Sequence, residues 1–158
     1  MKLVDVLKPE YIKIPLTETT KLEVIKELLS VLVEQKVVNN PDEVLTAILE
    51  REKIMTTGVG NGVAIPHCKT RHATDFAIAM GIHPTGIDFQ SLDNKPTQIV
   101  FLLIGPEDKP GTHIRLLSRI SRIISREKVR QQILQCSSPQ DVYNILKQEE
   151  ANFFEINP

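Results

Sequence analysis

Residues 98–105 read QIVFLLIG, an apolar run with no alternation of polar and apolar side chains. A strand with one face toward water alternates, whereas a strand covered on both faces is apolar almost throughout. We therefore expect a central strand over residues 97–104, in a sheet that carries helices on both faces.

Further strands are expected around this run. Residues 76–82 are similarly apolar, residues 86–89 favour a short strand between the two, and the β-branched segment 11–16 predicts another. With helical patterns before, between and after these strands, the sequence predicts an α/β fold: a single domain with a mixed β-sheet sandwiched between helices. We assign the domain to residues 1–150 and a C-terminal tail to residues 151–158.

The predicted helices have recognisable starts. Thr20 and Glu23 form a capping box, and Asn40 followed by Pro41 predicts a second helix that ends near Arg51. After residue 111 three more helices are expected; they carry, in order, Ile114, Leu117, Ile120 and Ile124, then Val129 and Ile133, and then Val142, Ile145 and Leu146 behind a Ser138 cap.

Composition excludes several classes of protein. The 158 residues include 19 Lys and Arg against 20 Asp and Glu, which gives no electrostatic reason to expect nucleic acid as a partner. No apolar run reaches the roughly 20 residues of a membrane span, so we expect no direct membrane insertion. Two cysteines, Cys68 and Cys136, form neither a disulfide framework nor a zinc pattern. We expect a cytoplasmic location.

The stretch 56–66, TTGVGNGVAIP, holds three of the seven glycines within five consecutive positions: Gly58, Gly60 and Gly62. Such a loop brings backbone N–H groups close to an anion, so it is a candidate phosphate-site loop. It matches neither a P-loop nor the dinucleotide fingerprint, and an ordinary tight turn remains the alternative.

His67 directly follows Pro66, and this is the position with chemical interest. Proline fixes its own φ and favours an extended conformation at Ile65, so the backbone that enters His67 is stiff. A neutral imidazole is nucleophilic near pH 7, and its phosphorylated form remains labile. A surface loop histidine is the alternative interpretation.

Motifs along the whole chain resemble one family. They are Arg51-Glu52, the stretch 57–67 (TGVGNGVAIPH), the stretch 100–106 (VFLLIGP) and His113 followed by Leu116-Leu117. This combination closely resembles the enzyme IIA domains of the fructose–mannitol class of the phosphotransferase system, which includes stand-alone nitrogen-regulatory members.

The resemblance implies roles for three residues. His67 corresponds to the histidine that the phosphocarrier HPr phosphorylates, Arg51 to the accessory arginine and His113 to the second active-site histidine. Arg51 lies 16 residues before His67 and His113 lies 46 residues after it, as in the family. The resemblance also implies a mixed sheet between helices. We expect no metal or cofactor.

Physical arguments support these roles. The planar fork of donors on Arg51 suits phosphoryl oxygens, although an arginine at a helix end also answers the helix dipole. His113 is expected in the first turn of a helix capped by Thr112, where the positive terminus attracts an anion; a half-buried, hydrogen-bonded histidine is the alternative. We expect the three residues to converge on one shallow site, with the glycine-rich loop along the approach to His67.

Other signals are weaker. The family often has glycine where Cys68 stands, and a small packing residue explains the cysteine. His67, Cys68 and His72 lack the spacing and the fourth ligand of a metal site. A stripe of arginines on one helix is typical of a solvated face, with a docking surface as the alternative; its members are Arg115, Arg119, Arg122 and Arg126.

Two functions fit the same histidine. In the first, the chain is a phosphotransferase that accepts a phosphoryl group from HPr and passes it to an EIIB domain in fructose-type sugar uptake. In the second, it is a nitrogen-regulatory protein whose phosphorylation state controls which target protein it binds. The transport function is slightly favoured, and the motif does not identify the sugar.

Overall fold

The computed structural model describes residues 1–154 and centres on a six-stranded mixed sheet. The strands are β1 Ile12–Lys13, β2 Gly58–Gly60, β3 Val63–Ala64, β4 His67–Thr70, β5 Ala77–Ile87 and β6 Thr97–Pro106. Their order is β1-β5-β6-β3-β2, and β4 also pairs with β6. β5 is antiparallel to β6, whereas β3 and β4 are parallel to it. The apolar run 98–105 is therefore the central strand, as predicted.

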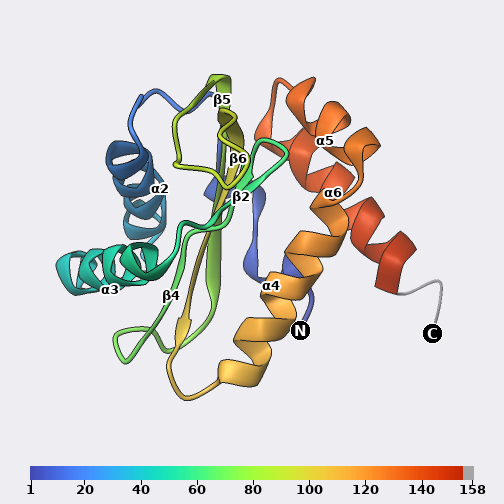
Figure 1. The fold of residues 1–158 in the computed structure, drawn as a ribbon. Helices are drawn as coiled ribbons and strands as arrows, with labels where there is room; N and C mark the ends of the chain where they lie inside the picture. Colours follow the sequence, from blue (N-terminus) through green and yellow to red (C-terminus); the bar gives the residue numbers. More distant parts are fainter. Residues whose placement is uncertain (155–158) are drawn as a thin grey trace.

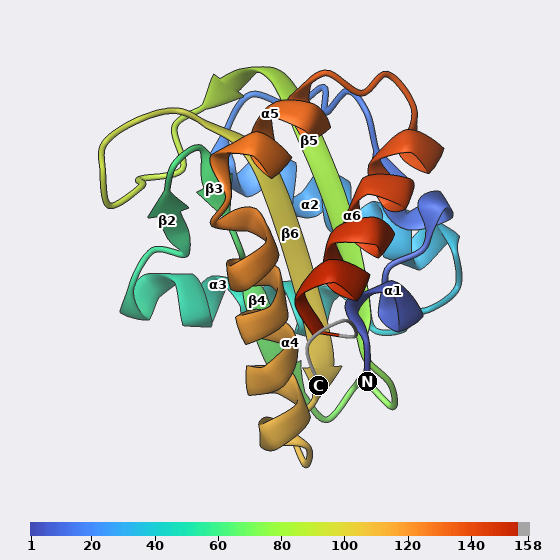
Figure 2. The same cartoon turned by 90° about the vertical axis from the view of Figure 1, so that its right-hand side faces the viewer.

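Helices cover both faces of this sheet. They are α1 Leu3–Val6, α2 Lys21–Glu34, α3 Pro41–Ile54, α4 Pro110–Ile124, α5 Glu127–Leu134 and α6 Pro139–Phe154, with a 3₁₀ turn at Pro9–Tyr11. Figure 1 shows α2 and α3 on one side of the sheet and α4, α5 and α6 on the other. Figure 2 shows α4 and α6 lying across the second face. The predicted α/β sandwich is confirmed.

Two strands differ from their predicted extents. β5 continues to Ile87 through a register shift after Ile82, so the short strand expected over 86–89 is the end of β5. The strand expected over 11–16 is reduced to Ile12–Lys13. Pro15 lacks the N–H that continues a ladder, and the next backbone hydrogen bond to the sheet comes from Leu16 N–H to the Ile82 carbonyl at 2.8 Å.

Helix starts follow local chemistry. Thr20 Oγ1 accepts from Glu23 N–H at the start of α2, and Ser138 Oγ accepts from Asp141 N–H at the start of α6. The prediction that Thr112 caps the fourth helix is wrong, because α4 begins at Pro110, whose fixed φ suits a first helical position.

The apolar face of α4 also differs from the expected one. Ile114 is 65% exposed, and the buried face consists of His113, Leu116, Ile120, Ile123 and Ile124. The exposed Ile114 therefore contributes to the surface beside the site and not to the core.

The predicted C-terminal tail begins inside a helix. Residues 151–154 complete α6, where Phe153 and Phe154 pack against the core, and residues 155–158 lie outside the described residues. The arginine stripe is not a uniformly solvated face either. Arg119 lies 3.1 Å from the buried Glu150 carboxylate and stacks on the Phe154 ring.

Glu150 also accepts the backbone N–H groups of Leu3 and Val4, which fastens α1 to α6. Within residues 1–154, no helix has the length and apolarity to cross a membrane.

Candidate functional site

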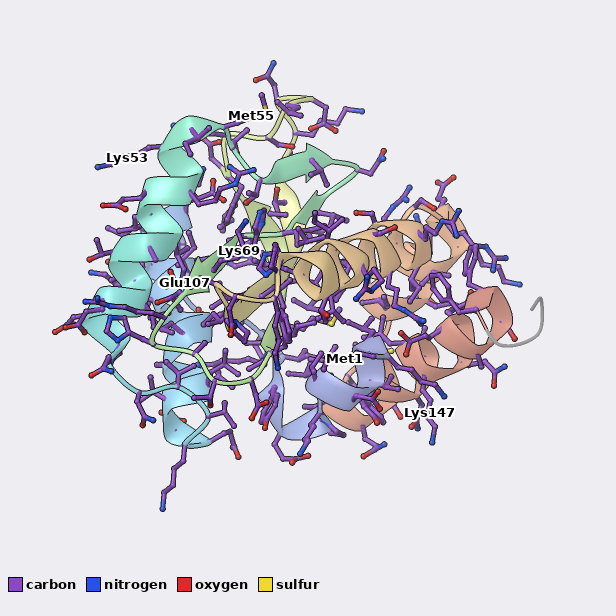
Figure 3. The ribbon with its side chains drawn as sticks, turned by 90° about the horizontal axis from the view of Figure 1, so that it is seen from below. Met1, Lys53, Met55, Lys69, Glu107 and Lys147 are labelled. Atoms are coloured by element: carbon purple, nitrogen blue, oxygen red, sulfur yellow. The ribbon has the colours of Figure 1, made fainter. Side chains whose placement is uncertain are left out.

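Arg51, His67 and His113 line one pocket of about 440 Å³ between α3, β4 and α4. They come from three separate segments: the last turn of α3, the first residue of β4 and the beginning of α4. The other lining residues are Ala47, Glu50, Ile54, Cys68, Lys69, Ile114 and Leu117. Figure 3 looks into this region, where the labelled Lys69 lies between α3 and α4.

The His67 ring is fixed by its own backbone. Its Nδ1 lies 2.8 Å from the Ile65 carbonyl oxygen, which only accepts, so Nδ1 carries the proton and Nε2 holds the lone pair. The backbone just before His67 is also held, because the Pro66 carbonyl accepts a hydrogen bond from Leu103 N–H of β6 at 3.0 Å. These two hydrogen bonds hold the backbone that enters His67, which Pro66 predicts to be stiff.

Burial lowers the pKa of His67 below its usual value of 6.5, and the positive charges of Arg51 and Lys69 lower it further. The Ile65 hydrogen bond and the Glu52 carboxylate act in the opposite direction. The ring is consequently neutral at pH 7 and presents Nε2 as a nucleophile.

His113 packs beside His67 with a ring-centroid distance of 5.5 Å, and Phe76 borders it at 6.1 Å. The side chain is buried, and neither ring nitrogen has a hydrogen-bond partner among the described residues. Burial lowers its pKa to about 4, with smaller contributions from His67 and Lys69. A buried polar atom left unpaired costs about 1–3 kcal/mol. The ring nitrogens therefore keep a hydrogen-bonding capacity that the described residues do not use.

Two cations border the same pocket. Arg51 donates from Nη1 to the Met55 carbonyl at 3.0 Å, so one of its five donors holds the C-terminal end of α3. Lys69 follows His67 by two residues in β4 and shares its face, because side chains in a strand alternate. No motif in the sequence marks Lys69. Recognising a strand at 67–70 would have placed it beside His67.

The structure does not bring the three glycines into this pocket. Gly58, Gly60 and Gly62 belong to the β2–β3 hairpin, whose turn has positive φ at Asn61 (58°) and Gly62 (78°). Gly58 packs against Ser91, and Gly60 (φ +100°) packs against Asp93. His67 lies five positions after Gly62, a span of about 16 Å in extended chain. The glycines thus serve the turn and are absent from the pocket lining, contrary to the expected phosphate-site loop.

Comparison with known proteins identifies the chain. Residues 5–149 match the family model described as the phosphoenolpyruvate-dependent sugar phosphotransferase system, EIIA 2. The chain belongs to this EIIA family.

Relatives of this EIIA chain fall into two groups. The fructose-specific EIIABC component of Bacillus subtilis is 36% identical over 95% of the chain, which spans about a quarter (24%) of that longer protein. The fructose-specific EIIA component of Haloferax volcanii is 36% identical over 87% of the chain and 89% of that protein. A nitrogen regulatory protein of Bradyrhizobium diazoefficiens is 32% identical over 92% of the chain and 95% of that protein.

Solved structures confirm the EIIA fold. The nitrogen regulatory protein IIA-Ntr of Neisseria meningitidis superposes with a TM-score of 0.84 at 27% identity, over 90% of this chain and 97% of that one. IIA mannitol of Escherichia coli superposes with a TM-score of 0.76 at 22% identity, over 88% and 97%, and that likeness concerns the fold alone.

Cys68 and His72 lie close to His67 in sequence; Cys68 also borders the pocket, whereas His72 does not. Cys68 lies on the opposite face of β4, and burial raises the pKa of its thiol to about 12. His72 contacts the Asn40 side chain, with 3.2 Å between Nδ1 and Nδ2. Within residues 1–154, no group of three His, Cys, Asp or Glu side chains is placed to hold a metal ion. Cys68 therefore fills core space, as the sequence argument expected.

Proposed function

We propose that this EIIA domain is a cytoplasmic phosphohistidine carrier, in which Nε2 of His67 accepts a phosphoryl group from an HPr-type phosphocarrier protein and passes it to an EIIB domain in fructose-type sugar uptake. The observation that carries the proposal is the hydrogen bond from His67 Nδ1 to the Ile65 carbonyl, which leaves Nε2 as the basic nitrogen in the pocket. The fructose-specific names of the Bacillus and Haloferax relatives support the transport assignment.

In the transfer step, the Nε2 lone pair bonds to the phosphorus of the donor's phosphohistidine. The donor's P–N bond breaks, and its electron pair returns to the donor ring. Nδ1 of His67 keeps its proton on the Ile65 carbonyl, so the phosphorylated ring carries positive charge. That charge makes the ring a good leaving group when the EIIB domain takes the phosphoryl group.

Negative charge on the phosphoryl oxygens has to be stabilised during both transfers. His113 supplies a ring with two unpaired nitrogens, and in its neutral form one of them donates an N–H. Arg51 and Lys69 line the same pocket and supply positive charge, which also lowers the pKa of His67. A dianionic phosphoryl group raises the proton affinity of His113, so binding of the group and protonation of His113 favour each other.

The docking partner is an EIIB domain by analogy of fold. The E. coli mannitol IIA, whose likeness to this chain is at the level of the fold, has been solved as a complex with phosphorylated IIB. Exposed apolar side chains at the pocket suit such a transient contact, since Ile54 is 79% and Ile114 65% exposed.

Incubation with phosphoenolpyruvate, enzyme I and HPr tests the assignment. We expect one phosphoryl group per chain, attached at Nε2 by ³¹P and ¹⁵N NMR, and none in His67→Ala. His72→Ala is the matched control, since His72 lies five residues away and outside the pocket lining. Label that persists in His67→Ala, or attachment at Nδ1, would contradict the proposal.

A regulatory function is the second candidate, and two similarities favour it. The Bradyrhizobium nitrogen regulatory protein matches over 95% of its own length, and the Neisseria IIA-Ntr superposes with a TM-score of 0.84. Transfer from the phosphorylated chain to a fructose-type EIIB domain separates the two candidates. Rapid transfer supports sugar uptake, whereas a phosphoryl group that stays on His67 supports control of a target protein by phosphorylation state.

A further inference from the structure

A buried carboxylate, Glu52, lies behind the pocket and is not among its lining residues. It accepts hydrogen bonds from Thr57, through the backbone N–H at 3.2 Å and through the hydroxyl. Lys21 of α2 completes the cluster with Nζ 2.8 Å from the carboxylate. Glu52 thus ties the segment after α3 to α3 itself and to α2.

A continuous series of hydrogen bonds leads from this carboxylate to the His67 ring. The Thr57 carbonyl accepts from Ile65 N–H at 3.0 Å, and the Ile65 carbonyl accepts from His67 Nδ1 at 2.8 Å. Thr57 therefore links Glu52 to the residue that fixes which nitrogen of His67 carries the proton. Both backbone groups of Ile65 take part: its N–H bonds to Thr57, and its carbonyl bonds to the His67 ring.

The same cluster holds the Arg51 side of the pocket. Arg51 is adjacent to Glu52 on α3, and its guanidinium donates to the Met55 carbonyl in the segment that Glu52 ties down through Thr57. Lys21 also reaches this segment, with Nζ 3.4 Å from Thr56 Oγ1. Both the nucleophile and its neighbouring cation are thus connected to one carboxylate.

We propose that Glu52, paired with Lys21, is a positioning residue: through Thr57 and Ile65 it fixes the His67 ring with its proton on Nδ1 and its lone pair on Nε2. The effect on transfer rests on the proposed function, whereas the effect on the ring does not. Glu52 touches no reacting atom. It acts by holding in place the Ile65 carbonyl that accepts the hydrogen bond from the His67 ring.

Electrostatics adds to this geometric role. The negative charge of Glu52 favours the protonated His67 ring, whereas the charged groups on the pocket side, Arg51 and Lys69, disfavour it. His113 also faces the ring, and it is neutral above about pH 4. Removing the Glu52 charge takes away a carboxylate that raises the pKa of His67, and that pKa then falls further.

Glu27 offers a matched control within the same chain. It is also a buried glutamate, and it accepts from the Thr17 backbone N–H and hydroxyl and pairs with a lysine, Lys13 Nζ at 3.0 Å. Its cluster ties Thr17 and Glu18, which precede α2, to the middle of that helix, and has no hydrogen-bonded link to Ile65 or His67 among the described contacts. Glu52→Gln and Glu27→Gln therefore remove the same kind of charge from the same kind of cluster.

The test is ¹⁵N NMR of the His67 ring in the unphosphorylated protein, beside the thermal midpoint. We expect both variants to lower the midpoint, but only Glu52→Gln to lower the His67 pKa and reduce the population protonated at Nδ1. Transfer from HPr should then fall roughly tenfold or more in Glu52→Gln and stay unchanged per folded molecule in Glu27→Gln.

Thr57→Val keeps the backbone hydrogen bonds and loses only the hydroxyl bond to Glu52. It serves as the second test in case Glu52→Gln does not fold. It should shift the ring populations in the same direction by a smaller amount, whereas Thr57→Ser should not. Unchanged His67 nitrogen shifts and pKa in Glu52→Gln or, if that variant does not fold, in Thr57→Val would overturn the proposal. Because these readouts need no phosphoryl donor, they remain decisive even if His67 proves not to be phosphorylated.

Discussion

His67 and His83 both adjoin a proline, and each has one ring nitrogen bonded to a backbone carbonyl, yet the two rings differ in what remains free. His83 is buried, with Nε2 3.0 Å from the Glu18 carbonyl and Nδ1 accepting from Gly86 N–H, also at 3.0 Å. Its hydrogen-bonding capacity is filled by the fold. His67 keeps Nε2 open in a pocket. An open nitrogen on a ring held by its backbone distinguishes the chemical histidine from the structural one.

The largest expected effect comes from making the same substitution, histidine to glutamine, at each of these two positions. His67→Gln should abolish phosphorylation by HPr and leave the thermal midpoint within a few degrees of wild type, since the ring makes a single hydrogen bond, to the Ile65 carbonyl, among the described contacts. His83→Gln should do the reverse, because loss of buried hydrogen bonds costs about 1–3 kcal/mol. The measurements are phosphate incorporation per folded molecule and thermal unfolding; loss of phosphorylation in folded His83→Gln would break the comparison.

His113 gives a second test of the comparison between the histidines, because its ring is buried like that of His83 but has no hydrogen-bond partner among the described residues. His113→Leu should slow transfer from HPr by about a hundredfold, the usual cost of one transition-state donor. Stability should hold or increase, since two unsatisfied nitrogens are removed from the core. Single-turnover transfer and urea unfolding test the pair of effects, and a large loss of stability would show that the ring is paired in solution.

Acid should affect the same residue in a defined window. The pKa of His113 is about 4 when folded against 6.5 ordinarily, so between these values the unfolded chain binds more protons. Stability therefore decreases as pH falls from 6.5 toward 4, and this contribution changes no further below that. The slope of unfolding free energy against pH should be shallower in His113→Leu; an identical slope would place the acid sensitivity elsewhere.

The two cations should give the smallest effects. Arg51→Lys keeps the charge and loses the planar fork, so transfer should slow roughly tenfold. Lys69→Met removes a more exposed and better screened charge, and we expect about a threefold reduction with a slight rise in the His67 pKa. Rates at two salt concentrations test this order, which a larger effect of Lys69→Met would invert.

Much of this was predictable because the signals are local. The run 98–105 indicated a doubly covered strand, and Thr20 and Ser138 marked helix starts. The chemistry of Pro66-His67 was likewise legible in the chain. Two of the predictions that failed depended on distant partners: the Arg119–Glu150 pair joins α4 to α6, and the glycine hairpin packs against residues 91 and 93. Lys69 was missed because a four-residue strand has too short a pattern to recognise.

The fastening of α1 by Glu150 has a consequence for how this domain can be joined to others. The contact uses backbone N–H groups of Leu3 and Val4, which an upstream segment leaves intact, and α1 packs against α6. Among the described residues, neither helix lines the His67 pocket. A linker that continues from either helix therefore starts outside the pocket lining. A tethered acceptor domain would then meet His67 at an effective concentration in the millimolar range, so that a weak contact suffices for rapid delivery.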